Sequence, residues 1–130
     1  MAASRLLDRV HVLIVDEDAA TRTALEAIVI AHGGLANVAS SADRAVEFAG
    51  VIRPSVLVSD LRLGGGKSGV WLLDRFRAGR LASVPVIAMS AFPGDDALAG
   101  SLPFSAFVRK PVDPRELCAL ILGVVDRRGR

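Results

Sequence analysis

Acidic, hydroxyl and basic side chains follow four separate apolar stretches of this sequence. Residues 16–18 (Asp-Glu-Asp) come directly after the first stretch, and Asp60 follows the second. Ser90 and Lys110 stand at the same place after the third and the fourth. If the four stretches are parallel strands of one sheet, their carboxyl ends meet at one edge, where open sheets of this kind bind ligands. The sequence therefore predicts that these polar groups form a single site.

The charges of these groups predict a bound cation. Asp16, Glu17 and Asp60 would place three carboxylates close together, and such crowding raises the pKa of one of them unless a cation intervenes. Lys110 supplies one positive charge, and a divalent ion would cancel the remainder. Oxygen ligands without His or Cys favour a hard ion such as Mg²⁺. A carboxylate beside Mg²⁺, a lysine and the Ser90 hydroxyl is suited to accepting a phosphoryl group.

The elements that must position these residues alternate along the chain. Apolar stretches rich in β-branched residues predict strands at 10–15, 35–39, 55–59, 84–89 and 106–109. Helical spacing and capping residues predict helices at 19–32, 41–49, 68–78 and 113–125, and a short or irregular helix within 94–105, where Gly100 and Pro103 interrupt the pattern. The third helix should bury Val70, Leu73 and Phe76. This alternation predicts an α/β fold with a parallel sheet covered on both faces.

Composition excludes several classes of protein. The chain has 130 residues, of which 52% are hydrophobic and 23% charged, which fits one packed domain and not a disordered chain. Cys118 is the only cysteine, so no disulfide framework forms within the chain. No apolar run approaches the ~20 residues of a membrane span, and no signal peptide is apparent, so we expect a cytoplasmic protein. The net charge is +2 and the basic residues are scattered, so we expect no direct contact with nucleic acid.

Four segments of the sequence resemble the receiver domain of bacterial two-component response regulators. They are residues 12–18, 57–63, 85–91 and 107–111, and they occur in the order of that family at nearly its separations. The resemblance covers residues 10–125 and leaves 1–9 as an N-terminal extension and 126–130 as a C-terminal tail. It implies a flavodoxin-like, doubly wound, five-stranded parallel sheet with strand order 2-1-3-4-5.

The resemblance also implies a role for each site residue. Asp60 would be the phosphoacceptor. Its phosphoryl group would come from a phosphohistidine on a sensor histidine kinase or a histidine phosphotransfer protein. The remaining roles would be Mg²⁺ ligation by Asp16, Glu17, Asp60 and the backbone carbonyl of Arg62, a switch hydroxyl on Ser90, a phosphate contact from Lys110 and a switch aromatic at Phe107. Such a domain is not an enzyme beyond self-catalysed phosphoryl transfer and slow autodephosphorylation. It would act on a downstream protein, whose identity and whose process the sequence does not give, and a homodimer is left open.

Three features depart from the usual pattern of that family. Glu17 stands where the second acid is most often Asp, and residues 64–66 (Gly-Gly-Gly) occupy a loop that usually holds Pro. The interval from Ser90 to Lys110 is short by about two residues, so a truncated fourth helix is expected.

Two other functions compete with phosphoryl acceptance at Asp60. One is a receiver-like binding module that is never phosphorylated, which Glu17 and the glycine loop favour. The other is a phosphatase of the haloacid dehalogenase type with Asp16 as its nucleophile, but Ala20 stands where that family expects Thr or Val. Labelling separates a phosphoacceptor receiver from the phosphatase: Asp60→Asn should abolish it in a receiver, and Asp16→Asn should abolish it in the phosphatase.

Overall fold

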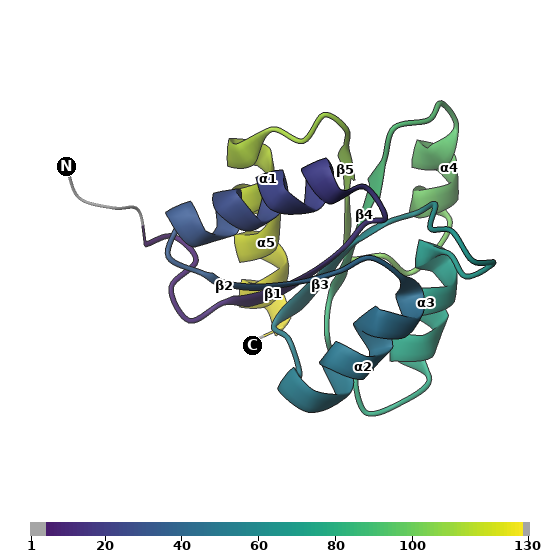
Figure 1. Ribbon diagram of the computed structural model, residues 1–130, viewed down its shortest axis with the longest axis horizontal. Coiled ribbons are helices and arrows are strands. Elements are labelled where there is room, and N and C mark those ends of the chain that lie inside the picture. Colours follow the sequence, from purple (N-terminus) through teal and green to yellow (C-terminus); the bar gives the residue numbers. More distant parts are fainter. Residues whose placement is uncertain (1–4, 129–130) are drawn as a thin grey trace.

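The fold consists of a central parallel sheet with helices on both faces (Figure 1). This computed structural model describes residues 5–128, with side chains described as far as Asp126. The elements in chain order are β1 (His11–Val15), α1 (Ala19–Ala31), β2 (Leu35–Ala39), α2 (Ala42–Ile52), β3 (Val56–Asp60), α3 (Gly69–Arg77), β4 (Val86–Ser90), α4 (Asp95–Gly100), β5 (Ala106–Arg109) and α5 (Pro114–Arg128). The strand order is β2-β1-β3-β4-β5, so the expected flavodoxin-like fold is confirmed.

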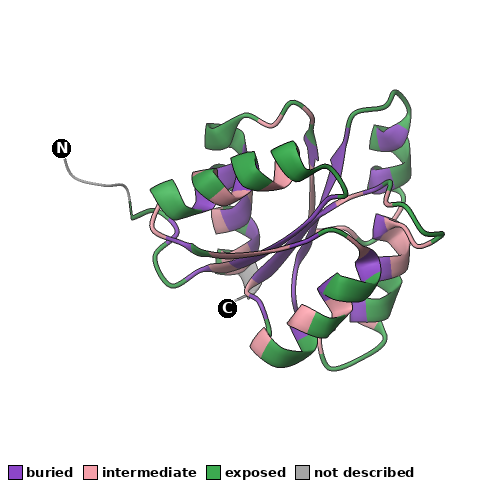
Figure 2. Ribbon diagram, viewed as in Figure 1, coloured by how far each residue is buried: buried purple, intermediate pink, exposed green. Residues whose placement is uncertain are grey.

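The apolar residues of the central strands alternate between two cores. In β1, Val12 and Ile14 face a cluster that includes Leu25 of α1 and Leu117 of α5. Leu13 and Val15 face the opposite cluster, which contains residues of α2 and α3. Both faces of β1 are therefore buried, which explains why its sequence is continuously apolar and not alternating. Figure 2 shows the same pattern in the central strands, which are buried, whereas the edge strand β2 is largely half-buried or exposed and the helices expose their outer faces.

Side chains cap the helices at the predicted positions. The N-cap Asp18 accepts a hydrogen bond from the backbone N–H of Thr21 at 2.9 Å. Ser41 caps α2 and Ser68 caps α3 in the same way. These bonds satisfy backbone donors that a helix leaves unpaired in its first turn, and they fix the first residue of α1, α2 and α3.

Several boundaries differ from the prediction. α2 continues to Ile52, three residues beyond the predicted end, and α5 continues to Arg128 through part of the expected tail 126–130. Within the expected extension 1–9, Leu7 is fully buried and joins the core beneath α1 and α5. The described domain therefore extends beyond 10–125 on both sides, while residues 1–4 and 129–130 lie outside the described part.

The buried face of α3 is rotated relative to the prediction. Leu73 and Phe76 are buried as predicted, but the third fully buried large residue is Leu72. Val70 is only half-buried and packs instead on a small cluster near α4 that contains Leu61, Ala88 and Ala99. Helix α3 thus contacts two apolar clusters, and a single helical stripe does not describe it.

Helix α4 is the shortest helix, as expected. It spans only Asp95–Gly100. The residue at its N-cap is Gly94, which has a φ of 87° and no side chain to cap the helix. Asp95 and Ala99 are its buried residues. No helix within residues 5–128 combines the length and the apolar character that crossing a membrane requires.

Candidate functional site

Lys110 joins two carboxylates that are far apart in the sequence. Its Nζ lies 2.6 Å from Asp16 Oδ2, just after β1, and 3.0 Å from Asp60 Oδ2, at the end of β3. Because β1, β3 and β5 are parallel strands of one sheet, their carboxyl ends bring these three residues to the same edge. The structure therefore places Asp16, Asp60 and Lys110 in one polar cluster.

Asp16 is the most enclosed member of this cluster. Only 1% of the residue is exposed, and its Oδ1 accepts a hydrogen bond from the backbone N–H of Asp18 at 2.9 Å. Its other oxygen accepts the bond from Lys110. The backbone carbonyl of Asp16 accepts a bond from the Arg22 guanidinium at 2.7 Å. Asp16 is thus held in place by partners on three sides.

Asp60 is more open to solution than Asp16. Its side chain is 14% exposed, and Oδ1 accepts a hydrogen bond from the backbone N–H of Arg62 at 3.3 Å. The backbone behind it is fixed, because Gly69 N–H donates to Leu61 O at 3.0 Å. A Cβ at Gly69 would lie 2.4 Å from the carbonyl oxygen of Asp60. A reagent can therefore approach the Asp60 carboxylate, while its main chain is closely packed.

Opposing effects act on the pKa of Lys110. Partial burial alone would lower it, because burial disfavours the charged ammonium. The hydrogen bonds and charges of Asp16 and Asp60 outweigh burial and raise the pKa above its ordinary value. Lys110 is therefore a permanent cation at neutral pH, aimed at the oxygens of Asp60.

Glu17 does not join the other two carboxylates. Its Oε2 accepts a hydrogen bond from the backbone N–H of Gly64 at 3.1 Å, in the loop between β3 and α3. Within residues 5–126, no three carboxylate, imidazole or thiol groups lie close enough together to hold a metal ion as they stand. His11 is paired with Asn37 at 2.6 Å, away from the site.

The hydroxyl of Ser90 contacts a partner that the sequence did not predict. Ser90 ends β4 and is 1% exposed, and its hydroxyl donates to Oδ2 of Asp95. The other oxygen of Asp95 accepts from the Arg62 guanidinium at 3.0 Å. Arg62 also lies over the Phe92 ring, 4.6 Å from its centroid. In the sequence, only the position of Asp95, five residues after Ser90, pointed to this contact.

Phe107 lies beside the Ser90 region. It pairs with Ala88 in the register of β4 and β5, and it is half-buried against Leu61, Ala88 and Ala99. Phe107 is thus neither fully exposed nor fully inside.

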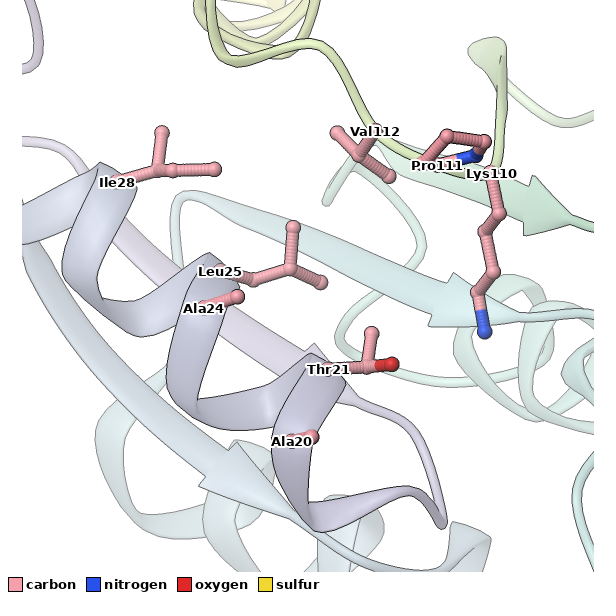
Figure 3. A pocket seen from close by; sticks show the side chains of 8 residues that line it. All are labelled: Ala20, Thr21, Ala24, Leu25, Ile28, Lys110, Pro111 and Val112. Atoms are coloured by element: carbon pink, nitrogen blue, oxygen red, sulfur yellow. The ribbon is translucent and has the colours of Figure 1, made fainter.

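An apolar hollow of about 320 Å³ opens next to Lys110 (Figure 3). One wall is α1, and the other is the segment that follows β5. The lining residues are Ala20, Thr21, Ala24, Leu25, Ile28, Lys110, Pro111 and Val112. The polar cluster is therefore bordered by a surface on which another molecule can rest.

Proteins of known sequence or structure are similar to this chain. The family model of the response regulator receiver domain matches residues 12–122. A protein of Leptolyngbya boryana, described as an uncharacterized 14.6 kDa protein in the sodA1 3' region, is 30% identical over an alignment of 118 residues. The match covers 88% of this chain and 89% of that protein.

Solved structures give the same result for the fold. A response regulator receiver protein from Pseudomonas putida has 29% identity and a TM-score of 0.79, over 93% of this chain and 98% of its own. The receiver domain of a sensor histidine kinase from Pseudomonas aeruginosa, solved with a magnesium ion in its active-site cleft, has 23% identity and a TM-score of 0.81, over 89% and 97%. The match over residues 12–122 places this chain in the response regulator receiver domain family of two-component signalling.

Proposed function

We propose that this chain accepts a phosphoryl group on Asp60 and thereby switches a protein-interaction surface. Receiver domains are in general signalling modules and not enzymes, and they interact with sensor kinases. The observation that carries the proposal is the Lys110 ammonium, 3.0 Å from the more exposed of two carboxylates. A fixed cation at that position can pair with the oxygens of a phosphoryl group that arrives there.

The transfer itself needs few groups from this chain. An oxygen of the Asp60 carboxylate forms a bond to phosphorus as the bond from phosphorus to the imidazole of a phosphohistidine breaks, and the imidazole takes up a proton. Lys110 then pairs with a phosphoryl oxygen. The donor would be a sensor histidine kinase or a histidine phosphotransfer protein. The phosphorylated chain would then act on a further, downstream protein.

A Mg²⁺ ion fits the donor set of this site in part. Asp16, Asp60 and the backbone carbonyl of Arg62 would hold it, and Glu17 would join only after leaving Gly64. All of these are oxygen donors, which Mg²⁺ prefers. When bound, the ion neutralises charge on the transferring phosphoryl group. The magnesium in the cleft of the Pseudomonas aeruginosa domain supports the same assignment.

The geometry disfavours the phosphatase alternative. A nucleophile at Asp16 would need an oxygen that a substrate can reach, yet only 1% of Asp16 is exposed. Asp60 keeps an exposed edge. The other alternative, a receiver-like module that is never phosphorylated, is tested by the titration described next.

A titration with beryllofluoride in the presence of Mg²⁺ tests the proposal, because this anion mimics a phosphoryl group on a carboxylate. Trp71 is half-buried in α3 beneath Lys67, so its fluorescence is a convenient signal, and amide shifts give the location. We expect saturable binding that requires both reagents. Asp60→Asn should abolish it, whereas Asp74→Asn, an exposed change on α3, should leave it intact. A folded wild-type chain that shows no response would instead favour the unphosphorylated module.

A further inference from the structure

The hydroxyl proton of Ser90 is already in use. Ser90 Oγ donates to Asp95 Oδ2 and accepts from the backbone N–H of Phe92 at 3.1 Å. Asp95 is 3% exposed, so its carboxylate depends on protein donors, which are Ser90 and Arg62. A buried carboxylate that loses a donor is destabilised, because water cannot replace the bond.

A serine hydroxyl has a single proton to donate. Ser90 can therefore bond either to Asp95 or to an oxygen of a phosphoryl group on Asp60, but not to both at once. Both acceptors are anions that would need the same proton. The hydrogen bond to Asp95 thus competes directly with phosphoryl recognition.

We infer that Asp95 is a positioning residue that withholds Ser90 from the phosphoryl site until the phosphoryl group displaces it. This inference rests on the proposed role of Asp60. Asp95 lowers the affinity of the site for a phosphoryl group, and it makes the engagement of Ser90 conditional on breaking a buried contact.

The same contact couples the site to helix α4. Asp95 is the first residue of that helix, which has only six residues and no side-chain N-cap. Its hydrogen bonds at this end are long, with Asp95 N 3.4 Å from Phe92 O and Leu98 N 3.4 Å from Gly94 O. Once Ser90 turns away, Asp95 retains the donor from Arg62, an exposed side chain that can follow it outward. Release of Asp95 therefore frees the first turn of α4.

Variants at two neighbouring aspartates test this inference. Asp95→Ala should bind beryllofluoride with Mg²⁺ about tenfold more tightly than the wild type, which corresponds to roughly 1.4 kcal/mol. Asp95→Asn, which keeps the shape of the side chain, should bind severalfold more tightly. Asp96→Ala is the matched control, because Asp96 is exposed and pairs with Arg109 on the surface. The control removes the same charge one residue away and should change the affinity less than twofold.

A double-mutant cycle shows whether the effect passes through the Ser90 hydroxyl. With Ser90→Ala in place, Asp95→Ala should give no further gain. A gain that persists in the Ser90→Ala background would come from charge removal or from freed Arg62, and the inference would be wrong. In addition, amide shifts of residues 94–100 in unliganded Asp95→Ala should move toward those of the wild type saturated with beryllofluoride.

The remaining outcomes separate this inference from the proposed function. If the wild type binds beryllofluoride through Asp60, and Asp95→Ala binds it no more tightly than the wild type and Asp96→Ala do, the role of Asp95 is wrong and that of Asp60 stands. If neither the wild type nor Asp95→Ala binds, both proposals are wrong. Binding by Asp95→Ala alone would support both.

Discussion

The carboxylate of Glu17 is hydrogen-bonded to the backbone N–H of Gly64, with Oε2 3.1 Å from the nitrogen. Two departures from the usual receiver sequence meet in this contact: the longer acid and the glycine loop. Gly64 allows the approach, because a Cβ at this position would lie 2.6 Å from Glu17 Oε2. The contact holds one acidic side chain outside the cluster formed by Asp16, Asp60 and Lys110, so it should weaken the binding of a cation there.

Shortening this acid should therefore strengthen Mg²⁺ binding. In Glu17→Asp the side chain is one methylene too short to reach Gly64, so its carboxylate is released toward Asp16. We therefore expect Mg²⁺ to bind about threefold more tightly. This gain in binding free energy is a fraction of the ~1.5–3 kcal/mol of a hydrogen bond to a charged group. Glu17→Gln keeps the reach but loses the charge, and it should bind more weakly. Titration of Trp71 fluorescence with Mg²⁺ measures both. Equal affinity of wild type and Glu17→Asp would show that the contact with Gly64 does not limit the site.

Removal of the Lys110 ammonium should destabilise the fold. In Lys110→Met the carboxylate of Asp16 stays buried without its cation, and we expect a loss of about 2–3 kcal/mol, less than for a fully buried pair because Lys110 is 19% exposed. Lys67 is the only other lysine and pairs with Asp43 at the surface, so Lys67→Met should cost no more than about 0.5 kcal/mol. Urea denaturation compares the two.

Magnesium should reverse part of this loss. With Lys110 absent, the two carboxylates are unopposed, so added Mg²⁺ should raise the midpoint of unfolding more in Lys110→Met than in the wild type. A midpoint that responds equally in both proteins would mean that the ion does not bind beside Asp16 and Asp60.

The fold could be predicted from local patterns because the central strands β1, β3 and β4 are buried on both faces and α1, α2 and α3 begin at capping side chains. The order of the strands came from the resemblance to a family, since no spacing of apolar residues fixes which strands are neighbours. A single helical stripe predicts Val70 in the core, whereas α3 packs on two clusters and buries Leu72 more deeply. Pairing between distant segments decided these points.

The site could be predicted only as far as strand ends determine it. Asp16, Asp60 and Lys110 follow strands directly, so the sheet itself brings them together. Glu17 and Asp95 depend on loop conformation: one side chain reaches the loop after β3, and the other is buried by a six-residue helix. Asp95 and Asp96 are adjacent aspartates, and nothing in the sequence shows that the first is buried and the second exposed.

The stability of the protein should fall above pH 8.5 because of Cys118. Its thiol is free and 2% exposed in α5, and burial raises its pKa above the ordinary value of about 8.5. Between the two pKa values the native state keeps the proton while the unfolded chain loses it. The contribution of Cys118 to the unfolding free energy is therefore complete below the ordinary pKa of the thiol, and it declines as the pH rises through the pKa of the native state. The difference in unfolding free energy between wild type and Cys118→Ala should be constant from pH 6 to about 8 and shrink by pH 10. A difference that grows with pH would contradict this sign.

The packing of Gly69 against the main chain of Asp60 predicts the last effect. A Cβ at Gly69 would lie 2.4 Å from Asp60 O and 3.0 Å from the Cα of Leu61, and both are backbone atoms that cannot turn aside. Gly69→Ala should therefore cost about 1–3 kcal/mol and shift Asp60, which would weaken beryllofluoride binding as well. Gly123→Ala is the control: it lies in α5 with nothing within 4 Å of the new Cβ, and it should stabilise the protein by about 0.5–1 kcal/mol. Equal stability of the two variants would mean that the main chain at Asp60 yields freely, and the proposed phosphoacceptor would then lack the rigid support inferred for it.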